Sequence, residues 1–241
     1  MATASPPEGE LQGRVVAVTD ERSPLAHRAI ALLQEAIGDV HPASYLLSEL
    51  QQTRQGRARG GDYHLLALPD PEGHAPLAAA AGVYLEAVHA GFVSYLAVHE
   101  DQRGRGLGRA LREQLVSSFR EEARAAGAGE LARVLGEVQR DSAWLRLLVR
   151  EGRVVPLDLP YFHPWMSRRG EGVYALYLEP LADLRTELPP TEAAQLVEAV
   201  WRRAYRIRDP EHWETYRYMM KRLEGRETVG PDPALLRMLS S

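Results

Sequence analysis

A glycine-dense segment with two arginines, Arg103-Gly104-Arg105-Gly106-Leu107-Gly108, has the residue types that are needed to bind a phosphate group. Glycine lets the backbone approach a ligand closely and adopt conformations that other residues avoid. Arginine adds a full positive charge and a planar fork of N–H donors that matches phosphate oxygens. If a helix begins here, its first N–H groups lack intrahelical partners and its dipole favours an anion. The segment therefore predicts a phosphate-binding turn.

Two common phosphate-binding motifs do not fit this segment. A dinucleotide-binding fingerprint that starts at Gly104 or Gly106 needs a small residue at its sixth place, where the chain has Arg109 or Leu111. A P-loop needs a lysine after its last glycine, and the only lysine of the chain is Lys221. Neither type of nucleotide site is therefore expected.

The elements on either side of the segment can be predicted from hydrophobic spacing. Residues 92–98 are apolar and rich in β-branched and aromatic side chains, which predicts a short buried strand. Leucine or phenylalanine then recurs at every fourth residue from Leu107 to Phe119, with charged residues between. This spacing predicts an amphipathic helix. The turn would thus connect a buried strand to a helix N-terminus.

The pattern Arg103-x-x-Gly106-x-Gly108 between such a strand and such a helix resembles the acetyl-CoA-binding signature of the GNAT N-acetyltransferase superfamily. In that family the backbone amides of the loop hold the CoA pyrophosphate, and the end of the preceding strand pairs with the pantetheine arm. The resemblance covers about residues 14–181. The segment 159–164 also resembles one seen in some bacterial members.

The resemblance implies acetyl-CoA as co-substrate and a set of residues that bind it. The last residues of the strand would contact the pantetheine arm, and the turn would contact the pyrophosphate. A second family pattern, described next, places Asp141 at its asparagine position. The implied cofactor-binding residues are Leu96, Ala97, Val98, Arg103, Gly104, Arg105, Gly106, Leu107, Gly108, Arg109 and Asp141.

The usual general acid of the family is a tyrosine, within a pattern like N-x-x-A-x-x-L-Y-x-x-x-G-F. In this chain Leu148 stands at the tyrosine position. A thiol has a pKa of about 8.5 and leaves readily, so catalysis does not depend entirely on this acid. Tyr161, one strand further on, is the candidate substitute. The alternative for Tyr161 is an aromatic side chain packed in a proline-bounded strand.

Glu137 is the candidate general base. It lies near the end of a strand predicted over residues 130–138, where family members open a gap for the pantetheine arm. A carboxylate there could accept the proton of an amine directly or through water. The alternative is an edge charge paired with Arg140 or Arg133.

The chain has no cysteine and no G-x-S-x-G motif, so a covalent acyl-enzyme is not expected. Direct attack of the amine in a ternary complex is the natural mechanism, with most of the rate gain coming from proximity. A backbone N–H near the end of the strand 92–98 would stabilise the oxyanion.

The order of elements agrees with the GNAT fold, an α/β (α+β) fold with a central mixed, mostly antiparallel sheet flanked by helices. Apolar residues at helical spacing after residue 191 predict a two-helix extension, packed on the core or on a partner chain such as a second copy in a homodimer. We expect residues 1–13 to be disordered, residues 14–182 to form the acetyltransferase domain and residues 183–241 to form the C-terminal helical extension. Strands are expected at 14–20, 63–68, 76–85, 92–98, 130–138, 154–155 and 173–178, and further helices at 24–37, 41–52 and 141–151, the last capped by Asp141.

Composition narrows the classes of partner. The 241 residues are 45% hydrophobic and 26% charged with a net charge of −4, as in ordinary globular proteins. No Lys/Arg cluster is present, so no nucleic-acid partner is expected. No secretory signal or membrane span is recognised, which predicts a cytoplasmic protein without a membrane partner. The histidines are scattered and cysteine is absent, so no metal site is expected.

Three functions stay open at this stage. The leading hypothesis is an acetyl-CoA-dependent N-acetyltransferase that acts on a primary amine of a small molecule or a peptide. The second is a non-catalytic CoA or acyl-CoA sensor or regulator with the same fold, which Leu148 at the tyrosine position favours. The third is an interaction protein in which the glycine turn only caps a helix.

Overall fold

The computed structural model of the protein describes residues 14–240, so the disorder expected for residues 1–13 lies outside the described range. The described chain forms two compact units. The first comprises residues 14–84 and 93–127, and the second comprises residues 85–92 and 128–240.

The strands of the first unit follow the order β1-β2-β3-β4. Their bounds are Val16–Ala17, Tyr63–Pro69, Pro76–Leu85 and Ala90–Val98. β2 runs antiparallel to both β1 and β3. β1 is much shorter than the strand predicted at 14–20. Val18 N still donates to Leu65 O of β2 at 2.8 Å, and the carbonyl of Asp20 accepts a turn hydrogen bond from Ser23 N at 3.1 Å.

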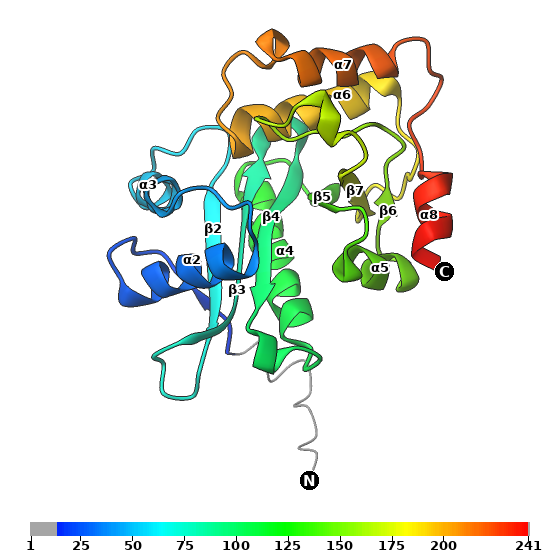
Figure 1. Ribbon diagram of the computed structural model, residues 1–241. Helices are drawn as coiled ribbons and strands as arrows, with labels where there is room; N and C mark the ends of the chain where they lie inside the picture. The colour runs from blue at the N-terminus through cyan, green and yellow to red at the C-terminus, as the bar shows by residue number, and fades with distance from the viewer. Residues whose placement is uncertain (1–13, 241) are drawn as a thin grey trace. The chain divides into compact units, whose positions relative to one another are not determined.

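Three helices belong to the first unit, and all three contact β2 (Figure 1). They are α2 (Pro24–Ala36), α3 (Ala43–Arg54) and α4 (Leu107–Ala125). Ser23 caps α2, since its hydroxyl accepts a hydrogen bond from Ala26 N. The apolar stripe of α4 is confirmed, because its four residues from Leu107 to Phe119 are buried. Arg112 lies between them in sequence and is also buried.

The strands of the second unit follow the order β5-β7-β6, with antiparallel pairing. They span Arg133–Gln139, Tyr174–Pro180 and Val155–Pro156. Gly136 on β5 lies opposite Tyr177 on β7, and a Cβ atom at Gly136 would lie 2.2 Å from the Tyr177 hydroxyl. Glycine is therefore required beside Glu137 so that the buried Tyr177 ring can cross the strand.

The helices of the second unit correct two expectations. α5 (Ala143–Arg150) is capped by Ser142, whose hydroxyl accepts from Trp144 N, and not by Asp141. The extension has three helices instead of two: α6 (Pro190–Ala199), α7 (Glu214–Leu223) and α8 (Pro233–Ser240). With eight residues, α8 is too short to show a clear hydrophobic period. Its first turn is fixed by the Asp232 carboxylate, which accepts from Ala234 N and Leu235 N at 2.9 Å.

Short helical turns complete the two units. A π-helical turn, η4 (Val200–Ala204), continues α6. The 3-10 turns are η1 (Glu86–Val88), η2 (Glu100–Gln102), η3 (Arg168–Gly170) and η5 (Pro210–His212).

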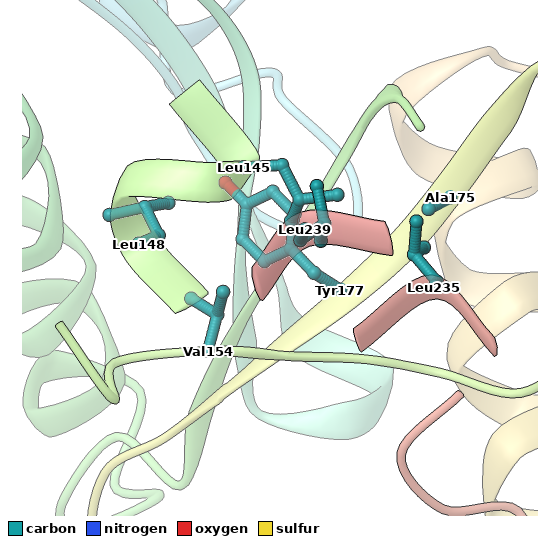
Figure 2. Close-up of a cluster of buried hydrophobic side chains, with 7 residues drawn as sticks. All are labelled: Leu145, Leu148, Val154, Ala175, Tyr177, Leu235 and Leu239. Atoms are coloured by element: carbon teal, nitrogen blue, oxygen red, sulfur yellow. The ribbon is translucent and has the colours of Figure 1, made fainter. Parts of the chain in front are cut away.

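Figure 2 shows the apolar cluster that joins α5 to α8 within the second unit. Leu148, which stands at the position of the family's tyrosine, is 1% exposed in this cluster. It packs with side chains of α5, β7 and α8, and with Val154. The residue at position 148 therefore stabilises the apolar core of this unit.

The predicted fold class is confirmed. The elements follow the predicted order β-α-α-β-β-β-α-β-α-β-β, the strands are mostly antiparallel, and C-terminal helices follow the last strand. Within residues 14–240, no helix combines the length and the apolar character that crossing a membrane would need.

Candidate active site

The predicted phosphate-binding turn lies between β4 and α4 in the first unit. After η2, Arg103 is extended and Gly104 has a φ of 75°. Gly106 has a φ of 80° and a ψ of −2°. Both glycines occupy the left-handed region, which side chains disfavour. The backbone conformation therefore favours glycine at positions 104 and 106 of the predicted turn.

The N-terminus of α4 has the features of an anion site. Gly106 is the N-cap residue and supplies no side-chain cap. The first intrahelical hydrogen bond runs from Ala110 N to Gly106 O at 3.1 Å. By position, the N–H groups of Leu107 and Gly108 precede it and have no intrahelical acceptor. The helix is 19 residues long, so its dipole adds partial positive charge at this end.

The remaining residues predicted to bind the cofactor in this unit flank the helix terminus. Leu96, Ala97 and Val98 are the last three residues of β4, with Ala97 buried and the other two half-buried. Arg103 and Arg105 are exposed, and the Arg105 guanidinium contacts the Gln102 side chain. Open backbone donors and two solvent-facing guanidinium groups are a donor set that fits the pyrophosphate of CoA.

The two predicted catalytic residues lie together in the second unit. The Tyr161 hydroxyl donates a hydrogen bond to Oε2 of Glu137 at 2.5 Å. A residue that the sequence did not indicate, Tyr205, donates to the other oxygen, Oε1. Glu137 is half-buried on β5, whereas both phenols are buried. The carboxylate is thus oriented by two O–H donors.

The two arginines considered as alternative partners of Glu137 hold other carboxylates. Arg140 pairs with Asp232 at 2.8 Å. Arg133 pairs with Asp183 and, at 2.6 Å, with Glu192.

Tyr161 is fully buried, and its backbone forms a bridge with Tyr174. Burial raises the pKa of its phenol well above the usual value, and the charge of Glu137 and the hydrogen bond to it raise the pKa further. The phenol therefore keeps its proton at neutral pH and acts as a hydrogen-bond donor to Glu137.

The C-terminal extension holds the segment around Tyr161 in place. The indole N–H of Trp201 donates to the Phe162 carbonyl at 3.1 Å, and Phe162 N donates to the sulfur of Met219 at 3.4 Å. Tyr205 follows the π-helical turn η4, and its N–H bonds to Val200 O. Trp201 and Tyr205 stand four residues apart, which in sequence indicates only a packed helix face, so no sequence signal pointed to Tyr205.

The predicted site residues therefore fall into two groups. The turn and the end of β4 belong to the first unit. Glu137, Tyr161 and Asp141 belong to the second, where Asp141 is exposed just before the cap of α5. Within the described range, no group of three or more His, Asp or Glu side chains could hold a metal ion.

Residues 30–143 match the model of the acetyltransferase (GNAT) family. This chain contains a GNAT-family domain. Members of the family are N-acyltransferases that use acetyl-CoA and act on amine acceptors. The matched segment includes the glycine turn and Glu137, whereas Tyr161 and Tyr205 follow its end.

Solved structures of GNAT proteins resemble the chain at low sequence identity. The ribosomal-protein-S18-alanine N-acetyltransferase from Escherichia coli is 16% identical over 70% of this chain and 93% of its own, with a TM-score of 0.48. The NatC complex bound to Gag peptide and CoA contains a chain that is 14% identical over 70% and 99%, with a TM-score of 0.48. An acetyltransferase from Streptococcus agalactiae 2603 is 14% identical over 70% and 99%, with a TM-score of 0.46. No curated protein matches the sequence.

Proposed function

We propose that this protein is an acetyl-CoA-dependent N-acetyltransferase that moves an acetyl group to a primary amine of a small molecule or a peptide. The observation that carries this proposal is the turn at Gly104 and Gly106, which opens an uncapped 19-residue helix inside the GNAT-family segment. A helix terminus without a side-chain cap favours an anionic ligand. The reaction is direct attack of the amine on the thioester in a ternary complex.

The turn would hold the pyrophosphate of CoA through the backbone N–H groups of Leu107 and Gly108, with Arg109 as a further contact. Arg103 and Arg105 would add charge at the solvent side. The final residues of β4 would pair with the pantetheine arm, and a backbone N–H near Val98 would stabilise the oxyanion. Asp141 is retained in the proposal as a cofactor contact. Bound acetyl-CoA supplies the activated thioester.

On the acceptor side, Glu137 would take the proton of the ammonium group, directly or through water. The Tyr161 hydroxyl would keep the carboxylate in the required orientation. The role of Tyr161 as a substitute general acid also stays a prediction. Its raised pKa argues against that role, since a phenol that holds its proton strongly protonates a thiolate of pKa about 8.5 poorly.

The domain division also belongs to the proposal. Residues 14–182 would form the acetyltransferase domain and residues 183–241 an extension that supports the acceptor side through Tyr205.

The second candidate function is a CoA-binding sensor or regulator. One observation favours it: the position of the family's general acid is occupied by Leu148, which lies in an apolar cluster. A sensor would bind acetyl-CoA without turning it over.

The test is a screen of primary amines and peptides in which a thiol-reactive dye measures released CoA. The chain contains no cysteine, so the protein itself gives no background. We expect an amine whose CoA release rises with pH as more of the amine becomes neutral. Glu137→Gln should lower the rate roughly a hundredfold, the low end for a lost general base, and should leave acetyl-CoA affinity unchanged.

A matched control is Glu171→Gln. Glu171 also accepts a tyrosine hydrogen bond, from Tyr218 at 2.9 Å, and has no role in the proposed chemistry. This variant should keep the full rate. If acetyl-CoA binds tightly and a broad panel of amines and peptides releases no CoA, the sensor function replaces the enzyme.

A further inference from the structure

Trp165 combines two unfavourable features in one residue. Its side chain is 60% exposed, and it is the only aromatic residue among the exposed large hydrophobic side chains of residues 14–240. Its backbone has a φ of 71°, in the left-handed region that a bulky residue disfavours. Exposing an indole to water and holding it on a strained backbone both cost free energy, so the two features together are evidence for a function.

The rings around Trp165 connect it to the carboxylate of Glu137. Trp165 lies edge-on to Tyr205, with ring centroids 5.7 Å apart, and Tyr205 donates its hydroxyl to Glu137. Trp213 also lies edge-on to Trp165, with ring centroids 6.5 Å apart. His163 stacks on Tyr205 at 6.1 Å with an interplanar angle of 17°. Every one of these residues lies in the second unit.

The backbone on either side of this aromatic group is irregular as well. Tyr205 directly follows the π-helical turn η4, and the next residue, Arg206, has a φ of 53°. Among the described residues, three that are not glycine have positive φ, and Trp165 and Arg206 are two of them. Isolated π turns and left-handed non-glycine residues occur preferentially at functional sites.

The chemistry of Trp165, Tyr205 and Glu137 favours a cationic ligand. An aromatic face attracts a positive charge through its quadrupole, and Trp is the strongest such residue. A carboxylate oriented by two phenols adds a negative charge beside Tyr205, the ring that Trp165 contacts. The same unit already contains one cation–aromatic contact, since the Arg168 guanidinium lies 4.0 Å from the Tyr218 ring centroid.

We propose that Glu137, Tyr205 and Trp165 form a binding site for an alkylammonium group, and that the acceptor is a cationic amine with an apolar body next to its ammonium. The identification of the bound amine as the acceptor rests on the proposed function, whereas the cation site itself does not. The site makes Trp165 and Tyr205 specificity-determining residues. It also gives the C-terminal extension a direct part in substrate selection, because Tyr205 and Trp213 belong to it.

The experiment measures binding of a cation and of its neutral counterpart without any turnover. The chain has four tryptophans, so labelling with ¹⁵N-tryptophan gives four indole N–H signals, and Trp165→Phe assigns the signal of Trp165. n-Butylammonium and n-butanol, which share the same apolar body, are titrated at pH 7 with acetyl-CoA absent. We expect the cation to shift the Trp165 signal in a saturable manner and the alcohol to leave it in place.

Variants test each member of the site by the dissociation constant of n-butylammonium. Glu137→Gln should weaken binding about tenfold, because a charge-assisted contact is lost. Trp165→Ala, followed through the Trp213 signal, should weaken binding about two- to fivefold, the range for an exposed cation–π contact, and Trp165→Phe should restore much of the loss. Tyr205→Phe should weaken binding less than Glu137→Gln, since the ring remains. Tyr218→Phe and the exposed Leu184→Ala are the controls and should bind normally.

Equal shifts from n-butylammonium and n-butanol would show that the site does not recognise charge and would overturn the proposal. So would unchanged affinity in both Glu137→Gln and Trp165→Ala. The proposed function fails separately, through absent acetyl-CoA binding or absent turnover. In that event a saturable, charge-selective shift that is lost in Glu137→Gln would still establish the cation site.

Discussion

The hydroxyl of Tyr205 donates a hydrogen bond to the carboxylate of Glu137, although 68 positions of sequence separate the two residues. Tyr161 donates to the same carboxylate from 24 positions away. Glu137 lies inside the segment that matches the GNAT family, whereas both phenols follow its end. The C-terminal extension therefore helps to fix the orientation of the proposed base, in addition to packing on the rest of the second unit.

Acetyl-CoA should stabilise the protein against heat, because a ligand that binds only the native state must shift the unfolding equilibrium. At a concentration of about a hundred times its dissociation constant, the gain in unfolding free energy should be about 2.7 kcal/mol. Thermal unfolding with and without millimolar acetyl-CoA measures this gain. An unchanged melting temperature would remove both the enzyme and the sensor hypotheses.

Gly106→Val should weaken acetyl-CoA binding severely. The side chain would force the N-cap out of its left-handed conformation and would stand where the pyrophosphate approaches the first N–H groups of α4. Gly127→Val is the matched control: Gly127 follows the other end of the same helix, also has a positive φ of 73°, and has open space around its Cβ position. Both variants carry backbone strain, so strain alone would affect them alike. Only Gly106→Val should lose affinity for acetyl-CoA in calorimetry, because only its side chain stands at the phosphate site. Equal affinities would locate the phosphate site elsewhere.

Leu148→Tyr should destabilise the protein by about 1–3 kcal/mol and should give no gain in turnover. The larger side chain and its hydroxyl would enter the apolar cluster between α5 and α8. The control is Leu147→Tyr on the same helix, where the side chain is 37% exposed and a larger residue has room. Urea unfolding measures both variants. A rise in the rate of CoA release in Leu148→Tyr would contradict the structural role given to this position.

The stability of the second unit should depend on pH through Asp183. Hydrogen bonds from Arg185 and the charges of Arg133 and Arg185 lower the pKa of Asp183 to about 2, against the opposing effect of burial. Because this pKa lies below the unfolded value of about 3.9, the stabilisation is present above about pH 4 and is lost as the pH falls through 2. Asp183→Asn should remove about 1–2 kcal/mol at pH 7 and flatten the fall in unfolding free energy between pH 4 and pH 2.

Asp158→Asn is the control for this pH dependence. Asp158 pairs with Arg226 at 2.9 Å, but its side chain is 51% exposed. Such an exposed pair contributes about 0–1 kcal/mol. If both aspartate variants lost the same stability in urea unfolding at pH 7, the contacts of Asp183 with Arg133 and Arg185 would not be the cause.

The helix expected to carry the family's general acid, a tyrosine, shows what a sequence pattern can and cannot predict. The pattern around Asp141 places Leu148 at the position of this tyrosine, which stays a prediction, and it also predicted that Asp141 caps the helix. Ser142 performs that role instead, because a cap is decided by one backbone turn and neighbouring polar residues compete for it. The third helix of the extension was missed for a related reason, since its eight residues give too few turns for a periodic pattern.

The sequence by itself determined most of the elements and the glycine turn before α4, because both depend on local chemistry. A spacing of four from Leu107 to Phe119 produces one apolar face, and the positive φ of Gly104 and Gly106 requires residues without a Cβ atom. Only the tertiary structure decided the surroundings of Glu137. Strand pairing and the packing of the extension bring Tyr161, Tyr205 and Trp165 into one group, and contacts between residues so far apart leave no periodic signal in the chain.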